Sequence, residues 1–389
     1  MTADLKLGIN VGYWQRDADD QTDTVLAAER CGYDSVFTAE AYGSDAFTPL
    51  TWYAARTSRI KLGTAVAQIS ARTPVATAMH ALTLDALSGG RVILGLGASG
   101  PQVVEGWYGQ PFPKPLARTR EYIDIVRQVW RREAPVTSPG PHYPLPLPAG
   151  AGLSASAPSG TDLGASGPGA SGLDASGLDA SGLDASGLDA SGLGGAGLGA
   201  SGLGKPLKSI VHPVRADIPV YLGAEGPKNV ALSAEIAQGW LPLFVDPAQI
   251  DAVFGASLAD RPDGFEIAAT VATIVTDDLR AALEFAKIPV AFYIGGMGAR
   301  QRNFHLDLIG RLGYAEQAAR VQELFLDGRR DEAIRAVPDE LADAVSLLGP
   351  IGRIKERLQL WRDSPVTTVL IAGVRDEPTL RAIKNLADS

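Results

Sequence analysis

A parallel (β/α)8 barrel of the α/β class is the fold that this sequence predicts, on three observations. Short apolar runs alternate with helix-like segments along most of the chain. The apolar runs are continuous, which is typical of parallel strands buried on both faces of a sheet. Eight such runs in 389 residues favour a closed barrel over an open sheet, the alternative on pattern alone.

The first half of the chain supplies four of these runs, each followed by a helix-like segment. The expected strands are Leu5–Tyr13, Asp34–Glu40, Ile60–Gln68 and Val92–Leu94. The expected helices are Thr22–Cys31, Asp45–Arg56, one that begins at Pro74 and ends before Gly89, and one that begins at Pro115. Thr73 is a preferred N-cap residue, Pro74 suits the first helical position, and Gly89 is typical of a helix end.

The second half repeats the alternation. The expected strands are Ile218–Gly223, Trp240–Phe244, Ile267–Thr276 and Val366–Ala372. The expected helices are Pro227–Ala237, Ala248–Leu258 and a last one from Glu377 to the end of the chain. We therefore expect a single barrel domain over residues 1–389.

Two stretches do not follow the alternation. Residues 149–204 are low in complexity, and the pentad Ala-Ser-Gly-Leu-Asp recurs through Leu173–Ser191. Such glycine-rich sequence buries too little surface to offset its ordering entropy, so we expect a disordered surface loop; a repeat with its own partner is the alternative. Gly295–Pro350 contains several helical segments, and this excursion before the last strand is expected to form a lid or a dimer contact.

The composition excludes several functional classes. With 35 Lys and Arg against 44 Asp and Glu, the chain has no basic footprint for nucleic acid or for a membrane surface. It lacks a signal-like N-terminus and any run of eighteen apolar residues, so we expect a cytoplasmic protein. Cys31, the only cysteine, is expected to be a small core residue, in keeping with a reducing compartment.

The strongest functional signal is the glycine-rich stretch Gly95–Gly100, directly after the strand Val92–Leu94. Taken literally it is G-x-G-x-x-G, the dinucleotide fingerprint, but three strand-like segments precede it and Gly100-Pro101 interrupts the expected helix start. A phosphate-binding loop of another architecture is favoured over a nicotinamide Rossmann site or a purely structural turn.

A second glycine-rich loop, Gly223–Lys228, opens directly into a helix, where free N–H groups favour a phosphate. The carboxylate of Glu225 is unsuited to an anion, so its side chain is expected to point elsewhere. In a (β/α)8 barrel these loops share the carboxyl-terminal rim with Asn10, Tyr13 and Glu40. The rim shows no metal-ligand spacing and no nucleophile triad, so we predict a phosphorylated cofactor and no metal.

Three segments resemble the luciferase-like monooxygenase superfamily, on its deazaflavin (coenzyme F420)-dependent oxidoreductase side. They are Gly32–Phe47, Ser58–Gly109 and Ile218–Trp240. The pairing of LSGGR and LGLG (Leu87–Gly97) with the later loop that contains Gly226-Pro227 is specific, and the order of the segments matches nearly the whole chain outside the pentad stretch.

The resemblance implies a luciferase-like barrel, usually a homodimer, that holds coenzyme F420 with its ring over the strand ends. It places a non-proline cis peptide at Ala65-Val66, behind the ring, and Glu40 close to the ring. As catalytic residues we expect Glu40 and Tyr13, either of which, or solvent, would supply the proton. The residues that would bind the cofactor are Asn10, Ala65, Val66, Gly97, Ala98, Ser99, Gly100, Pro101, Gln102, Leu222, Gly223, Ala224, Glu225 and Gly226. A rim salt bridge is the alternative role for Glu40.

One departure from the family bears on the reaction. Related dehydrogenases carry a proton-transferring histidine after this acid, where the present chain has Ala41. Hydride transfer from the reduced cofactor to an activated double bond or carbonyl of a small or medium organic substrate is therefore favoured over alcohol oxidation. The alternatives are an FMN-dependent monooxygenase on the same barrel and a cofactor-binding protein without catalysis.

Overall fold

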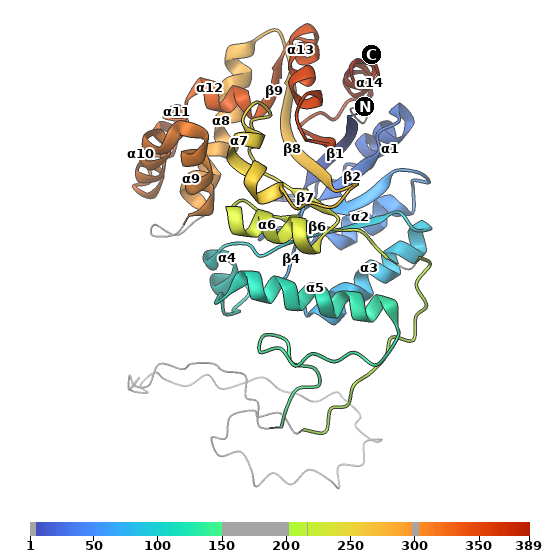
Figure 1. Ribbon diagram of the computed structural model, residues 1–389. Helices are drawn as coiled ribbons and strands as arrows, with labels where there is room; N and C mark the ends of the chain where they lie inside the picture. The colour runs from blue at the N-terminus through green and yellow to red at the C-terminus, as the bar shows by residue number, and fades with distance from the viewer. Residues whose placement is uncertain (1–4, 150–201, 216, 298–302) are drawn as a thin grey trace, which may run out of the picture.

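The computed structural model describes residues 5–149, 202–215, 217–297 and 303–389 (Figure 1). Within these ranges, ten strands are formed. They are β1 (Lys6–Gly12), β2 (Ser35–Thr38), β3 (Lys61–Thr64), β4 (Ala67–Gln68), β5 (Val92–Gly97), β6 (Val220–Gly223), β7 (Gly239–Leu241), β8 (Glu266–Val275), β9 (Ser346–Gly349) and β10 (Thr368–Ala372). The glycine-rich stretch at 149–204 lies outside the described residues except for its ends.

A closed parallel barrel is formed, as the sequence predicts. The strands follow the order β10, β1, β2, β3, β5, β6, β7, β8, and a β8–β10 pairing closes the ring. The third barrel strand is split: β3 pairs with the first half of β5 and β4 with the second half. Because all pairs are parallel, the carboxyl ends of the eight barrel strands meet at one mouth.

Helices surround the barrel (Figure 1). They are α1 (Thr22–Cys31), α2 (Phe47–Ala54), α3 (Pro74–Ser88), α4 (Pro101–Gly106), α5 (Pro115–Arg131), α6 (Pro227–Ile236), α7 (Ile250–Phe254), α8 (Leu279–Gly296), α9 (Phe304–Ile309), α10 (Ala315–Leu326), α11 (Arg330–Arg335), α12 (Asp339–Ala344), α13 (Ile351–Arg362) and α14 (Glu377–Ala387). The expected start and end signals of α3 are confirmed: the Thr73 side chain accepts a hydrogen bond from the Ala76 N–H, and Gly89 is left-handed.

One local prediction is wrong. Gly100-Pro101 does not interrupt a helix; α4 begins at Pro101, because proline is well suited to the first helical position. The excursion Gly295–Pro350 contains the expected helical segments, and it also contains the strand β9, which was not predicted and pairs with the end of β8 beyond the barrel. Its remaining described part forms α9 to α12, with a π-helical turn at Gly310–Tyr314, and stacks beside α8 (Figure 1).

The barrel interior is filled by six side chains from six different strands. They are Phe37, Ile93, Tyr221, Leu241, Ala268 and Leu370. Glycines on neighbouring strands leave space for the rings: a Cβ at Gly63 would lie 2.2 Å from Phe37, and one at Gly239 would lie 2.7 Å from Tyr221. The interior is therefore a packed core, in which large side chains contact the backbone of glycines on neighbouring strands.

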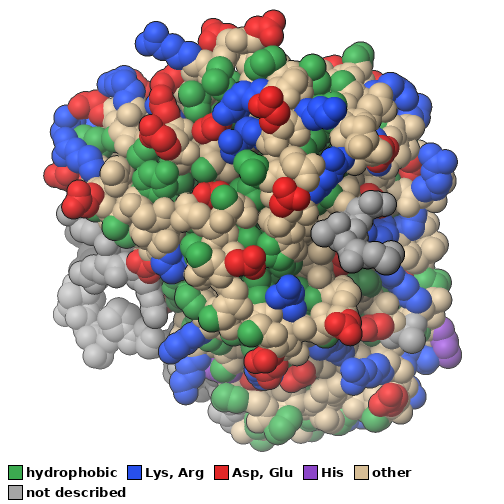
Figure 2. Space-filling model, turned by 45° about the horizontal axis from the view of Figure 1, so that its top comes forward, with side chains coloured by type: hydrophobic (Ala, Val, Ile, Leu, Met, Phe, Trp, Pro, Cys, Tyr) green, Lys and Arg blue, Asp and Glu red, His purple; other side chains and the backbone are tan. Residues whose placement is uncertain are grey.

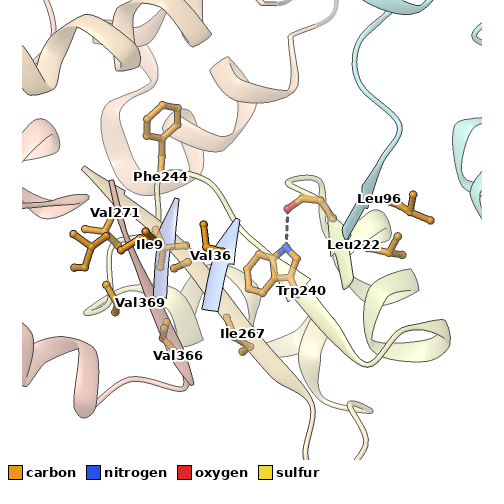
Figure 3. Close-up of a cluster of buried hydrophobic side chains, with 14 of the residues drawn as sticks. Ile9, Val36, Leu96, Leu222, Trp240, Phe244, Ile267, Val271, Val366 and Val369 are labelled. Carbon is orange, nitrogen blue, oxygen red and sulfur yellow. Dashed lines mark hydrogen bonds between the residues drawn. The ribbon is translucent and has the colours of Figure 1, made fainter. Parts of the chain in front are cut away.

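Between the barrel and its helices lies the larger core. Residues next to the interior ones in each strand point outward, among them Ile9, Val36 and Val369 (Figure 3). Trp240 is fully buried here, and its Nε1–H donates to the carbonyl oxygen of Ala224 at 2.8 Å. This bond ties the end of β6 to β7 and fixes the start of the second glycine-rich loop.

The substitution Gly63→Ala is expected to lower the free energy of unfolding by about 1–3 kcal/mol, because the new methyl group overlaps the Phe37 ring. Urea unfolding followed by circular dichroism measures the effect. Gly352→Ala in α13 is the matched control, since a Cβ there meets no atom within 4 Å. The control should be as stable as the parent or slightly more so. Equal stabilities for both variants would contradict the interior packing described above.

The molecular surface carries charges of both signs. Figure 2 shows acidic and basic side chains scattered over one face with hydrophobic side chains between them. This mixed pattern accompanies a formal net charge of −9. None of the helices in the described residues is long and apolar enough to cross a membrane.

Candidate functional site

The two glycine-rich loops lie side by side at the barrel mouth, as predicted. β5 and β6 are neighbouring strands, and Gly97 is in register with Gly223. Both loops therefore leave the barrel from adjacent positions, although more than a hundred residues separate them in the sequence. The closed barrel contradicts the Rossmann interpretation of Gly95–Gly100, which requires an open sheet.

Val66 lies between the two loops. The Ala65-Val66 peptide bond is cis, which confirms the prediction, and it falls in the gap between β3 and β4. A Cβ at Gly97 would lie 2.4 Å from Val66 Cγ2, and one at Gly223 would lie 2.9 Å from Val66 Cγ1. Glycine at both positions is thus what allows the Val66 side chain to sit at the junction of the two loops.

The loop after β5 has a distinctive backbone. Ser99 is left-handed, with φ of 57°, a conformation that is uncommon for residues other than glycine. Gly100 then lies next to the end of α8, since a Cβ there would be 3.3 Å from the carbonyl oxygen of Met297. The loop therefore runs between the barrel mouth and α8.

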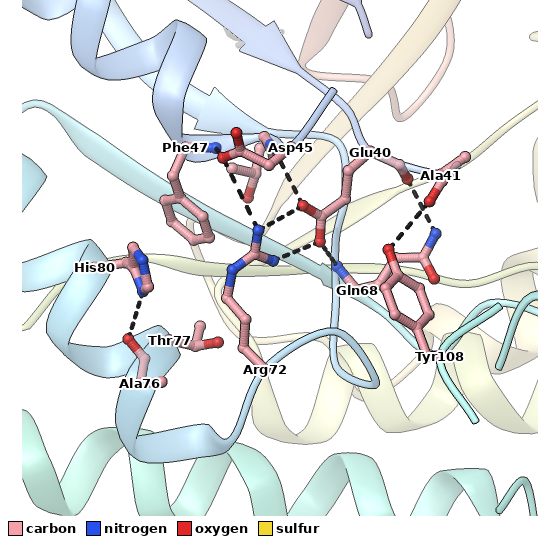
Figure 4. A network of polar contacts seen from close by, with 12 residues as sticks. Glu40, Ala41, Asp45, Phe47, Gln68, Arg72, Ala76, Thr77, His80 and Tyr108 are labelled. Atoms are coloured by element: carbon pink, nitrogen blue, oxygen red, sulfur yellow. Dashed lines mark hydrogen bonds and ion pairs between the residues drawn. The ribbon is translucent and has the colours of Figure 1, made fainter. Parts of the chain in front are cut away.

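Glu40 lies at the end of β2 and is almost fully buried. Arg72 donates two hydrogen bonds to its carboxylate, at 2.7 and 2.9 Å (Figure 4). The backbone N–H groups of Gln68 and Ala46 donate two more, at 2.8 and 3.1 Å. The Gln68 amide also donates to the Glu40 carbonyl oxygen. Both carboxylate oxygens are thus occupied by protein donors.

The Glu40–Arg72 pair ties three segments together: the end of β2, the strand β4 and the start of α2. Burial lowers the pKa of the Arg72 guanidinium, but the hydrogen bonds and the charge of Glu40 outweigh burial and raise that pKa above its usual value. Close by, the Tyr108 hydroxyl donates to the Ala41 carbonyl oxygen at 3.1 Å. This geometry favours the salt-bridge interpretation of Glu40 over a direct catalytic role.

On β1, the Asn10 side chain is held on both sides. Its amide donates to the Thr270 hydroxyl at 2.9 Å, and its oxygen accepts from the Gly12 N–H at 2.9 Å. Tyr13 follows at the strand end and is half-buried. Burial, with a smaller effect from Tyr42, raises the pKa of the Tyr13 hydroxyl, so this group stays protonated at neutral pH.

The side chain of Glu225 points at the helical excursion, in line with the expectation that it avoids an anion at the loop. Its Oε1 lies 2.7 Å from His305 Nδ1, and Arg311 donates to its carbonyl oxygen at 2.7 Å. His305 and Arg311 are not among the site residues that the sequence predicts. Their contacts with Glu225 depend on the tertiary packing of α9 and the turn after it, and no local sequence pattern predicts them.

Tyr293 of α8 brings the mouth loops and the excursion together. Its ring packs edge-on against Phe244, with centroids 5.4 Å apart, and against His305, at 4.8 Å. Burial raises the pKa of the Tyr293 hydroxyl, with further contributions from Tyr13, Glu225 and Tyr42. Tyr293 of α8 therefore links Phe244, in the loop after β7, to His305 of the excursion.

Comparisons with known proteins agree with this architecture. The model of the luciferase-like monooxygenase family matches residues 6–190 and 202–368. Rv3520c of Mycobacterium tuberculosis, to which a coenzyme F420-dependent oxidoreductase activity is ascribed, is 49% identical over 382 residues, or 96% of each chain. A 5,10-methylenetetrahydromethanopterin reductase of Archaeoglobus fulgidus is 26% identical over 361 residues, which cover 90% of this chain and 87% of that one.

A solved structure shares the fold. The coenzyme F420-dependent tetrahydromethanopterin reductase from Methanopyrus kandleri superposes with a TM-score of 0.67 at 23% identity, over 99% of this chain and 98% of that one. The family match spans most of the chain, and the mouth carries the cis peptide and paired loops that the resemblance led us to expect. The chain belongs to the luciferase-like monooxygenase family and is an oxidoreductase.

Proposed function

We propose that the protein is a deazaflavin (coenzyme F420)-dependent oxidoreductase that transfers hydride between this cofactor and a small or medium organic substrate. The observation that carries the proposal is the meeting of the two glycine-rich loops over Val66 at the barrel mouth. The extensive identity to a relative with that ascribed activity supports the choice of cofactor.

The residues at the mouth fit such a group. The paired glycines Gly97 and Gly223 keep bare backbone beside Val66, where any larger residue would collide with it. Residues 97–102, with 65–66 and 222–226, would hold the cofactor. The side chains of Asn10 and Glu225 are engaged by protein partners, so we assign them to shaping the loops around the cofactor.

A bound deazaflavin supplies the ring carbon that gives or takes the hydride. Reduction of the substrate also requires a proton donor, which the chain or solvent must supply. Arg72 occupies the Glu40 carboxylate, so we assign proton donation to the Tyr13 hydroxyl or to solvent, with Glu40 in a positioning role. Ala41 leaves no histidine after Glu40, and this supports reduction of an activated double bond or carbonyl over oxidation of an alcohol.

Titration of the purified chain with coenzyme F420 and, separately, with FMN tests the cofactor assignment. We expect saturable quenching of cofactor fluorescence by coenzyme F420 and much weaker binding of FMN. Tighter binding of FMN would instead support the luciferase-like monooxygenase alternative. The family resemblance also supports a homodimer, which light scattering of the same samples measures.

Incubation with reduced coenzyme F420 and a panel of enones then tests the reaction. We expect reappearance of oxidised-cofactor absorbance that depends on both enzyme and enone. Brisk alcohol oxidation without enone turnover would reverse the proposed direction. Binding without turnover across enones, aldehydes and alcohols would support a cofactor-binding protein without catalysis.

A further inference from the structure

A pocket of about 350 Å³ opens at the barrel mouth beside the loop after β5. Its walls are Tyr42, Gln102, Val103, Gly106, Trp107, Gly296 and Met297. They come from three segments far apart in sequence: the loop after β2, helix α4, and the end of α8. The volume falls within the range of about 300–1,000 Å³ that is typical of small-molecule sites.

Among the described residues, the side chains that line the pocket are aromatic, apolar or an amide, and none of them is charged. Trp107 is 62% exposed and Tyr42 is 46% exposed, although burial of large aromatic side chains is energetically favourable. The Tyr42 hydroxyl lies 3.9 Å from the sulfur of Met297, which joins two walls of the pocket. The seven lining side chains offer three hydrogen-bond donors: the Tyr42 hydroxyl, the Gln102 amide and the Trp107 indole N–H.

The pocket is continuous with the loop that we assign to the cofactor. A Cβ at Gly100 would lie 3.3 Å from the Met297 carbonyl oxygen and 3.9 Å from Gln102 Oε1. Gln102 thus borders both the cofactor loop and the pocket. A molecule in the pocket would lie beside the proposed cofactor site.

We infer that this pocket is the substrate subsite and that it selects neutral, flat, largely apolar carbonyl compounds over carboxylates and phosphate esters. The inference rests on the proposed function and adds the class of substrate. Trp107 and Tyr42 supply apolar contact area, and Tyr42 and Gln102 donate to the carbonyl oxygen. An anion would lose its hydration here without gaining a cationic partner among the lining residues.

Two probes of equal size test the selectivity without turnover. Benzylideneacetone is a neutral aromatic enone, and trans-cinnamate is its charged counterpart. Equilibrium dialysis against the full chain, with and without coenzyme F420, is expected to show benzylideneacetone binding at least about tenfold more tightly than cinnamate. Equal affinity for the two probes, or no binding of the enone, would overturn the inference.

Two glycine variants test the location. Gly106 lines the pocket and a Cβ there meets no atom within 4 Å, so Gly106→Phe adds a ring at the pocket wall with no clash at its Cβ. Gly352→Phe in α13 is the matched control, with equally open surroundings. We expect Gly106→Phe to weaken enone binding at least about tenfold and the control to leave it unchanged. Equal binding by both variants would place the enone elsewhere and contradict the assignment.

A third variant and one further measurement complete the design. Trp107→Ala removes an exposed wall and should also weaken enone binding, while its circular dichroism stays that of the parent. Coenzyme F420 is titrated into every variant. If the parent chain binds coenzyme F420 but not the enone, the substrate inference fails alone; if the parent binds the enone but not coenzyme F420, the proposed function fails instead.

Discussion

Replacing Arg72 with alanine is expected to lower the free energy of unfolding by about 3–5 kcal/mol. The Glu40 side chain is only 3% exposed, and the Arg72 side chain is 16% exposed. Without the guanidinium, the buried carboxylate keeps only the N–H groups of Gln68 and Ala46 as donors. A buried charge that loses its partner costs far more than an exposed one, because water cannot replace the lost interaction. Urea unfolding followed by circular dichroism measures the loss.

Arg375→Ala is the matched control. Arg375 makes the same two-pronged contact with Asp19, at 2.8 and 2.6 Å, but its side chain is 60% exposed. Solvent screening limits the expected loss there to about 1 kcal/mol or less. The double variant Arg72→Ala with Glu40→Gln should recover about 1–3 kcal/mol relative to the sum of the single losses. Strict additivity would show that the ion pair itself is not the cause.

The barrel could be predicted from the sequence because its signals are local. Each strand is a short apolar run, and α3 begins and ends at residues whose intrinsic preferences specify a cap, so no tertiary information was needed. The strand β9 was not predicted. It is four residues long, and among the described strands it pairs only with the end of β8, beyond the barrel. A run that short is indistinguishable from a buried turn of helix by its periodicity.

The site was predictable only in part, for the same reason. The paired loops follow from glycine-rich strand ends in a barrel, where neighbouring strands bring their ends together. The partners of charged groups do not follow. Arg72 reaches the Glu40 carboxylate across 32 residues, and Arg311 reaches the Glu225 backbone carbonyl oxygen across 86. The partner of each arginine is decided by how the helices pack on the barrel, and residue spacing does not predict it.

Gly97→Ala is expected to weaken binding of coenzyme F420 about a hundredfold, a change of about 2.8 kcal/mol. The added Cβ would lie 2.4 Å from Val66 Cγ2, so the Val66 side chain and the loop must separate. Alanine is otherwise compatible with the backbone, because Gly97 is not among the residues with positive φ. The loss should therefore appear in the dissociation constant, measured by cofactor fluorescence, more than in the urea midpoint.

A second substitution distinguishes steric displacement of Val66 from loss of the glycine itself. Val66→Ala removes both γ carbons and leaves its Cβ at 3.4 Å from the new methyl group, an ordinary contact distance. Gly97→Ala combined with Val66→Ala should then bind coenzyme F420 more tightly than Gly97→Ala alone, even though each substitution removes native contacts. If the double variant binds no better than Gly97→Ala, Val66 is not what holds the loop in place. If Gly97→Ala binds like the parent, the cofactor does not use the junction of the two loops, and the proposed function loses the observation that carries it.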